Sequence, residues 1–249
     1  MPVVLCANEA PSPDDAWSFL VEASNIRKTQ PLAVLVCPGI ARLTVISGVA
    51  PVGKSFVLSG ELLSIGGAEE DADFSMDPSV RAKHASLVNS DGNYVIRDEG
   101  ADNGVYVRVR SRQKLALPAK VRVGAQQLHV VAAKDDQPYV WQDGTRLLTS
   151  PPRLGTFAVH QILEGGLVGA AALVSDNDVT IGCSGARLDL SHDPAISSSH
   201  ARIFAEDGAV WLEDLGSTNG TYVRVQGEVA LQHGDLLWVG QQLLRFDLT

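Results

Sequence analysis

The chain has 249 residues, with 20 Lys and Arg against 29 Asp and Glu, so its formal net charge is −9. Hydrophobic residues make up 45% and charged residues 20%, which is typical of a folded globular protein and excludes an intrinsically disordered chain. The acidic balance argues against nucleic-acid partners, and no apolar stretch reaches the roughly 20 residues that membrane insertion requires.

The cysteines predict a reducing environment. There are three of them, Cys6, Cys37 and Cys183, an odd and scattered set that suits neither a disulfide framework nor a zinc site. The N-terminus lacks a basic segment followed by an apolar one, so no secretory signal is expected. We therefore expect an intracellular, cytoplasmic protein without a metal site or cofactor.

The first 39 residues are predicted to form an extension with a short helix. Ser12-Pro13-Asp14-Asp15 has the features of a helix start, and Trp17, Leu20 and Val21 follow at helical spacing. An exposed Trp next to an apolar run would be a liability, so we expect residues 1–39 to pack on the first domain.

An internal repeat organises the rest of the chain. His84-Ala85 recurs as His200-Ala201, and the run from Asn103-Gly104 recurs from Asn219-Gly220, at the same offset of 200 − 84 = 219 − 103 = 116 residues. This ungapped register predicts two copies of one unit, at 40–134 and 153–249, joined by a linker at 135–152 that is rich in charge and proline. A unit of this length is expected to be a whole domain.

Each copy is predicted to be all-β. Short segments rich in β-branched and aromatic residues, such as Leu43–Ile46, Tyr94–Arg97 and Val210–Leu212, are separated by Gly, Asn and Asp. Asp91-Gly92 and Asp207-Gly208 are typical of hairpin turns. We therefore expect an all-β fold of two β-sandwiches in tandem, preceded by the helix-containing extension.

One motif points to a different class of protein. The segment Gly48 to Ser55 matches the phosphate-binding loop pattern G-x-x-x-x-G-K-[ST]. That chemistry needs a helix that begins at Lys54, whereas a β-like run, Phe56-Val57-Leu58, follows. We expect a hairpin turn here, and NTP binding remains a remote alternative that an ATP titration with Lys54→Ala would test.

The second copy carries a motif with a specific resemblance. Ser197-Ser198-Ser199-His200 is followed by Asp214-Leu215-Gly216-Ser217-Thr218-Asn219-Gly220. This series resembles the forkhead-associated (FHA) domain, whose pattern is Gly-Arg, then Ser-x-x-His, then Asn-Gly along a β-sandwich. The offset of 116 extends the resemblance to the first copy, so it covers roughly four-fifths of the chain.

The resemblance implies a non-catalytic protein–protein interaction module that binds phosphothreonine segments of partner proteins. Hydroxyl, amide and guanidinium donors on loops suit a phosphate dianion. In copy two it implies a phosphopeptide site on Ser197, Ser198, Thr218 and Asn219, while Cys183 stands at the arginine position and Arg187 is the nearest replacement cation. His200 and Gly220 are implied to be structural.

Copy one departs further from the family pattern. Gly67 stands at the arginine position, Arg81 at the serine position, and Asp102 would repel a phosphate beside Asn103. Only Asn103-Gly104 and His84 remain, and His84 and Gly104 are implied to be structural. We expect copy one to be a degenerate site that does not bind phosphothreonine in the manner of the family.

Two hypotheses for function follow. In the first, copy two docks a phosphothreonine segment and copy one is architectural. In the second, both copies serve as a phosphate-independent scaffold or docking subunit of a larger assembly, because both lack the family arginine. Neither hypothesis is enzymatic.

Overall fold

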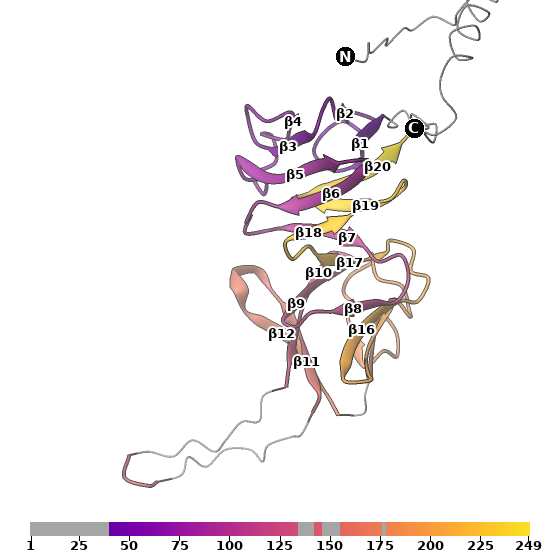
Figure 1. The fold of residues 1–249 in the computed structure, drawn as a ribbon. Helices are drawn as coiled ribbons and strands as arrows, with labels where there is room; N and C mark the ends of the chain where they lie inside the picture. The colour runs from indigo at the N-terminus through magenta and orange to yellow at the C-terminus, as the bar shows by residue number, and fades with distance from the viewer. Residues whose placement is uncertain (1–39, 134–141, 146–154, 176–177) are drawn as a thin grey trace, which may run out of the picture. The chain divides into compact units, whose positions relative to one another are not determined.

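The computed structural model describes residues 40–133, 142–145, 155–175 and 178–249 (Figure 1). The predicted extension 1–39 lies outside the described residues, as does the linker 135–152 apart from 142–145. The described chain is built from strands, with one short 3-10 turn at Glu164–Gly166, which confirms the all-β fold class.

The first repeat forms ten strands. They are β1 (Ala41–Ser47), β2 (Ser55–Val57), β3 (Leu62–Gly66), β4 (Ala72–Asp73), β5 (Lys83–Ser90), β6 (Asn93–Asp98), β7 (Val105–Arg108), β8 (Gln113–Leu115), β9 (Ala119–Val123) and β10 (Gln126–Ala132).

The second repeat forms the ten equivalent strands. They are β11 (Phe157–Ile162), β12 (Val168–Val174), β13 (Asp178–Gly182), β14 (Leu188–Asp189), β15 (Ala201–Glu206), β16 (Ala209–Asp214), β17 (Thr221–Arg224), β18 (Glu228–Ala230), β19 (Leu236–Val239) and β20 (Gln242–Leu248). Several pairs, such as β3 and β13, match at the offset of 116 to the residue.

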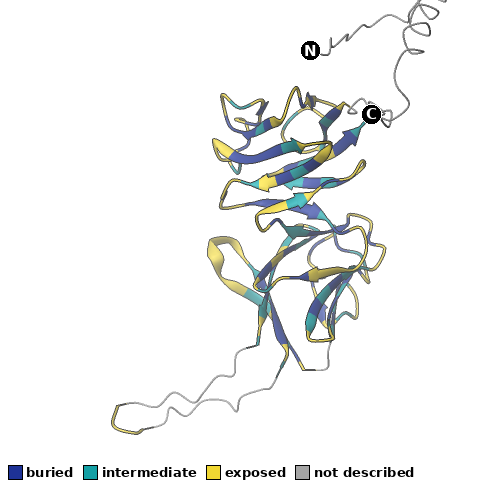
Figure 2. Ribbon diagram, in the orientation of Figure 1, coloured by how far each residue is buried: buried dark blue, intermediate teal, exposed yellow. Residues whose placement is uncertain are grey.

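The strands follow the pattern of the sequence. In β1 every second residue is buried, with Leu43 and Val45 fully enclosed, as expected for a strand with one face in a core. Asp91-Gly92 and Asp207-Gly208 have positive φ angles of 52° and 83°, and of 50° and 71°, which suit the tight hairpins predicted there. Figure 2 shows buried and exposed residues alternating along the strands.

Three sheets make up the described fold. One ten-stranded sheet has the order β12-β11-β10-β9-β17-β7-β19-β20-β1-β2, and two five-stranded sheets have the orders β14-β13-β15-β16-β8 and β18-β6-β5-β3-β4. Sandwich 1 is the half of the large sheet from β7 to β2 with the sheet that contains β3–β6. Sandwich 2 is the half from β12 to β17 with the sheet that contains β13–β16. Each five-stranded sheet therefore has its own half of the ten-stranded sheet.

The two repeats exchange their last three strands. The first repeat contributes β1–β7 to sandwich 1 but β8–β10 to sandwich 2, where β8 pairs with β16 and β10 with β11. The second repeat contributes β18–β20 to sandwich 1 in return, where β18 pairs with β6 and β20 with β1. In Figure 1 the yellow strands at the end of the chain accordingly lie among the indigo and magenta strands of its beginning.

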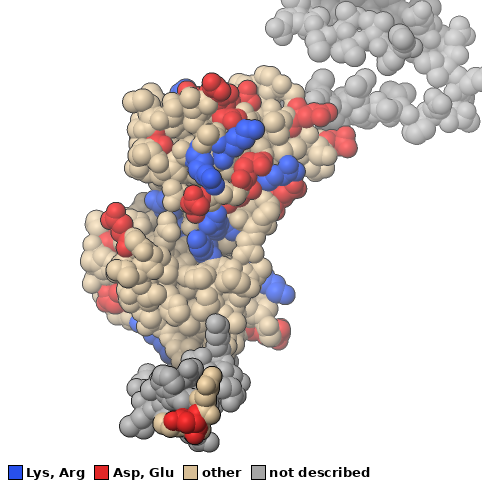
Figure 3. Space-filling view, turned by 90° about the vertical axis from the view of Figure 1, so that its left-hand side faces the viewer, with Lys and Arg blue, Asp and Glu red and all other residues tan. Residues whose placement is uncertain are grey.

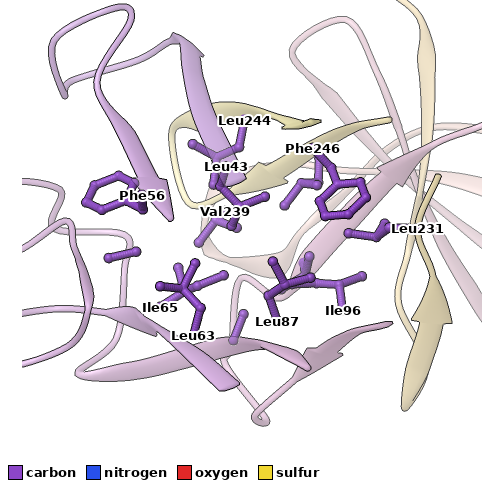
Figure 4. Packing of buried hydrophobic residues seen from close by; sticks show 14 of the residues in the cluster. Leu43, Phe56, Leu63, Ile65, Leu87, Ile96, Leu231, Val239, Leu244 and Phe246 are labelled. Carbon is purple, nitrogen blue, oxygen red and sulfur yellow. The ribbon is translucent and has the colours of Figure 1, made fainter. Parts of the chain in front are cut away.

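The hydrophobic cores show the same exchange, because each contains residues of both repeats. In sandwich 1, Leu231, Val239 and Phe246 of the second repeat pack with Leu43 and Ile96 of the first (Figure 4). The core of sandwich 2 likewise contains residues 109–130 of the first repeat, among them Val121 and Leu128, both fully buried. Neither sandwich can bury its core with residues of one repeat alone.

The repeats meet at a local twofold axis between β7 and β17. Val107 of β7 pairs with its own equivalent, Val223 of β17, and the flanking pairs are Tyr222 with Arg108 and Arg224 with Tyr106. Each repeat was expected to be a whole domain. The structure differs, because each sandwich is assembled across this axis from both repeats.

Candidate functional site

The two loops that carry the motif of the second repeat lie together at one edge of sandwich 2. His200 is fully buried between them: its Nδ1 accepts a hydrogen bond from the Ser197 amide (3.0 Å), so Nε2 carries the proton and donates to the Gly220 carbonyl (3.1 Å). This histidine ties the 195–200 loop to the 214–220 loop. Its position agrees with the structural role that the resemblance implies.

Ser197, Thr218 and Asn219 come together at this edge. The Ser197 hydroxyl accepts a hydrogen bond from the Thr218 amide (3.2 Å), so its own proton remains available for a ligand. The Asn219 side-chain amide donates to the Ala195 carbonyl (2.8 Å) and keeps its oxygen free. Thr218, Asn219 and the neighbouring Ser198 are exposed, so the edge presents neutral donors and acceptors to solvent.

Asp214 holds the 214–220 loop in place through hydrogen bonds. Its carboxylate accepts hydrogen bonds from the Ser217 hydroxyl (2.7 Å) and from the amides of Ser217 (2.8 Å) and Gly216 (3.0 Å). Burial would raise the pKa of Asp214, but these hydrogen bonds outweigh it and lower that pKa below its ordinary value. Asp214 therefore stays ionised and fixes the turn that presents Thr218 and Asn219.

Cys183 occupies the position at which the family pattern has arginine. Its amide donates to the Ser197 carbonyl (3.2 Å), so its backbone borders the site, while its half-buried side chain packs against the core of sandwich 2. Gly182 before it is required sterically, because a Cβ there would collide with the Ser198 carbonyl oxygen. The pattern is kept in the backbone, but this position supplies no cation.

Arg187 does not replace the missing arginine. Its guanidinium donates to the carbonyl oxygens of Asp178 and Leu173, both at 3.1 Å. Asp178 begins β13 and Gly182, next to Cys183, ends it, so the carbonyl of Asp178 lies about 13 Å along the strand from Gly182. These two contacts hold the Arg187 side chain at the opposite end of β13 from Cys183, and they do not support the sequence-based assignment of Arg187 to the phosphopeptide site.

The equivalent edge of sandwich 1 has the same framework with different chemistry. His84 ties its loops as His200 does, through the Arg81 amide (3.1 Å) and the Gly104 carbonyl (3.1 Å). Arg81 stands at the serine position and is turned to the Gly100 carbonyl (3.0 Å), with Asp102 3.9 Å away. Asn103 donates to the Ser79 carbonyl (2.9 Å).

The positions equivalent to Cys183 and Ser197 supply no thiol or hydroxyl on this edge, because they are Gly67 and Arg81. The amide of Gly67, at the arginine position, donates to the Arg81 carbonyl (2.9 Å), and the Asp102 side chain is 91% exposed. The carboxylate of Asp102 thus projects into solvent at the position equivalent to Thr218. That copy one is a degenerate site stays a prediction.

Sequence reasoning missed two arginines that reach across the twofold axis. Arg224 of the second repeat donates to the carbonyls of Ala101 (2.6 Å) and Asp102 (3.2 Å) and pairs with Asp98, all in the 98–104 loop of the first repeat. Arg108 lies in the equivalent place beside Gly220, where a Cβ would come within 2.5 Å of its Nε. Both repeats carry Tyr-Val-Arg-Val, but the sequence does not show that the strand exchange places each arginine on the opposite loop.

The Gly48–Ser55 segment is a hairpin between β1 and β2, and no helix begins at Lys54. Three of its amides are already engaged: Ala50 donates to the Gln242 side chain (3.0 Å), Gly53 to the Val45 carbonyl (2.8 Å) and Lys54 to the Pro51 carbonyl (3.1 Å). These three amides are therefore not available to a nucleotide phosphate, and the helix start that such a loop needs is absent at Lys54.

Within the described residues, no group of three or more His, Cys, Asp or Glu side chains is placed to hold a metal ion. In the same part of the chain, no helix is long and apolar enough to cross a membrane.

Comparison with known proteins agrees with the motifs. The family model for the FHA domain matches residues 63–125 and 168–240, together more than half of the chain. Two curated relatives, the FHA domain-containing protein FhaB of Mycobacterium tuberculosis strains CDC 1551 and H37Rv, are each 39% identical over 62 residues. That match spans 25% of this chain and 40% of the length of each relative.

Two solved structures were also found. The first is Mycobacterium tuberculosis EmbR in complex with a low-affinity phosphopeptide, with a TM-score of 0.36 and 12% identity over 94% of this chain and 29% of that one. The second is the FHA domain of CT664 from Chlamydia trachomatis, with a TM-score of 0.23 and 26% identity over 37% of this chain and 97% of that one. The two matched segments of the family model fall on the two repeats, and the chain belongs to the FHA domain family.

Proposed function

We propose that the chain is a non-catalytic protein–protein interaction module and that the edge of sandwich 2 docks a phosphothreonine segment of a partner. The observation that carries this proposal is the junction of Ser197 and Thr218, whose hydrogen bond of 3.2 Å leaves the serine proton free for a phosphate oxygen. Asn219, exposed beside them, offers an amide oxygen to the backbone of a bound peptide.

The missing arginine sets the strength of binding. A hydrogen bond from a charged donor contributes about 1.5–3 kcal/mol, and Cys183 cannot supply it. The side-chain donors of Ser197, Thr218 and Asn219 are neutral, so affinity should lie roughly tenfold to a hundredfold below that of the same edge with an arginine at position 183.

The test is phosphopeptide binding to the full chain, first on a phosphothreonine library and then by titration of the best peptide. Ser197→Ala should weaken binding by about 1 kcal/mol, whereas Ser199→Ala, in the same loop but outside the proposed site, should not. Cys183→Arg should strengthen it. The proposal fails if no peptide in the library binds in a phosphate-dependent manner to either the wild type or Cys183→Arg.

A second candidate function is docking that does not depend on phosphate. The observation that favours it is that neither Gly67 nor Cys183 supplies a cation, while the His84 and His200 loop ties are retained. A partner captured equally well before and after phosphatase treatment would support this function, and strict dependence on phosphate would exclude it.

A further inference from the structure

A cavity of about 430 Å³ lies between β8 and β18, the first strands after the chain crosses from one sandwich to the other. It is lined by residues 107, 108 and 110–114, the last two of which belong to β8, and by Val229 and Ala230 of β18. Arg108, Arg110, Arg112 and Lys114 all contribute to its wall. Four cations in seven residues are unusual in a chain of net charge −9, and the equivalent positions of the second repeat are Arg224, Gln226, Glu228 and Ala230.

Two of the four cations are neutralised and fixed. Arg110 forms a two-pronged ion pair with Asp235, whose carboxylate is buried. Arg112 pairs with Glu206 and stacks over the rings of Trp211 (4.1 Å) and Phe204 (4.8 Å). These contacts give the wall a fixed shape.

The other two cations, Arg108 and Lys114, have no carboxylate partner among the described residues. Comparison across the twofold axis explains the case of Arg108. Its equivalent, Arg224, pairs with Asp98, whereas the matching carboxylate of Asp214 is occupied by the Ser217 hydroxyl (2.7 Å), a side chain that the first repeat lacks at Ala101. Arg108 therefore keeps an uncompensated charge that borders the cavity.

The backbone around the cavity is also unpaired on one side. β8 is the last strand of its five-stranded sheet, and β18 is the last strand of the other. An edge strand presents N–H and C=O groups that can pair with an added strand. Strands β8 and β18 are both labelled in Figure 1, and Figure 3 shows Lys and Arg gathered around the middle of the face it presents, with Asp and Glu beside them.

We propose that this cavity docks an extended acidic segment of a partner protein. The free charges of Arg108 and Lys114 would face two carboxylates on one side of the segment, and the edge of β8 or β18 would pair with its backbone. Charge complementarity selects the occupant, because the two uncompensated cations stand on a chain that is otherwise acidic. The cavity adjoins the 214–220 loop, because Arg108 lies beside Gly220, but Ser197, Thr218 and Asn219 are not among its lining residues, and the proposal requires no phosphate.

The test uses a fluorescein-labelled peptide of alternating Glu and Thr, with the same peptide of Gln and Thr as its neutral control, and fluorescence anisotropy with the full chain. The acidic peptide should bind saturably, and more weakly as salt rises from about 50 mM to about 300 mM. Arg108→Gln with Lys114→Gln should weaken binding about tenfold, the loss expected for two surface ion pairs.

The matched control is Lys54→Gln with Lys83→Gln. Both lysines are exposed residues of sandwich 1, and replacing them lowers the net charge by the same amount. It should leave binding within about twofold. Ala230→Glu should weaken binding, and Ala230→Gln, of the same size, should not. Circular dichroism verifies that each variant is folded.

Equal binding of the neutral peptide, equal loss in the Lys54 and Lys83 control, or no binding at about 1 mM peptide would each overturn the proposal. Ser197→Ala should leave binding of the acidic peptide unchanged, so that failure here and failure of the phosphothreonine site are distinguishable.

Discussion

Asp77 and Asp193 accept equivalent hydrogen bonds, each from a turn that the opposite repeat supplies. The Asp193 carboxylate binds the Ala125 amide (2.8 Å) and the Gln126 side chain (2.9 Å). The Asp77 carboxylate binds the Gln241 amide (2.8 Å) and the Gln242 side chain (2.8 Å). These two aspartates fasten the exchanged strands to the sandwiches that they complete.

Replacing one of these aspartates should destabilise the protein. Asp193→Ala leaves the Ala125 amide and the Gln126 side chain without their acceptor, which costs about 1–3 kcal/mol. Urea denaturation would measure the change in the free energy of unfolding. The matched control is Asp189→Ala, an exposed carboxylate that accepts from the Ser191 amide within its own loop, and it should change stability much less. Equal effects of the two substitutions would contradict the fastening role.

The same aspartates should make the free energy of unfolding depend on pH. Burial tends to raise the pKa of Asp77 and of Asp193, but their hydrogen bonds outweigh it and hold both pKa values below the ordinary 3.8. The stabilisation is therefore complete above the pKa of the unfolded chain and is lost as the pH falls through the lower, folded pKa.

Asp77→Asn and Asp193→Asn test this dependence. Other carboxylates with lowered pKa values, such as Asp214 and Asp247, also contribute to acid unfolding, so the informative quantity is the difference between wild type and variant. That difference in the free energy of unfolding should shrink between about pH 6 and about pH 3. A difference that is constant over this range would show that the two carboxylates do not titrate with folding.

The first repeat by itself should not form a monomeric sandwich. A chain that ends at residue 134 lacks Leu231, Val239 and Phe246, which complete the core of sandwich 1. It should be either unfolded or a dimer that reproduces the exchange between two copies. Light scattering with circular dichroism would distinguish these states, and a cooperatively folding monomer would contradict the expectation.

His200→Ala should loosen the candidate site and lower stability together. The substitution removes two buried hydrogen bonds, to Ser197 and Gly220, and leaves their backbone groups unpaired, at a cost of about 1–3 kcal/mol for each group. Thermal unfolding gives the stability change, and titration with a phosphothreonine peptide gives the binding change. His192→Ala, at an exposed position, is the control, and unchanged peptide affinity in His200→Ala would separate the loop tie from binding.

Much of the fold is predictable from the sequence because the signals are local. Positive-φ residues at Asp91-Gly92 and Asp207-Gly208 mark hairpins, and β-branched runs mark the strands on either side. The offset of 116 identifies β13 as the equivalent of β3, and β20 as the equivalent of β10. The convergence of Ser197, Thr218 and Asn219 follows from the family motif once His200 is recognised as the residue that ties the loops.

The strand exchange has no such signal. Leu128 and its equivalent Leu244 are both core residues, so the hydrophobic pattern is the same whether each repeat closes its own sandwich or the other one. The choice lies in the course of the chain after β7 and β17, where Val107 and Val223 pair across the axis. The cross-axis position of Arg108 and the orientation of Arg187 depend on tertiary contacts that spacing cannot show.

The pairing of β1 with β20 brings Ile40 and Thr249 together, with their amides donating to each other's carbonyls at 2.8 and 3.2 Å. β10 and β11, which flank the 134–154 segment, are likewise antiparallel neighbours. Residues 40 and 249 therefore lie side by side, and so do the strands on either side of the 134–154 segment. A circular permutant that links Thr249 to Ile40 and opens within 134–154 would keep every strand pair, with the order of the two repeats reversed.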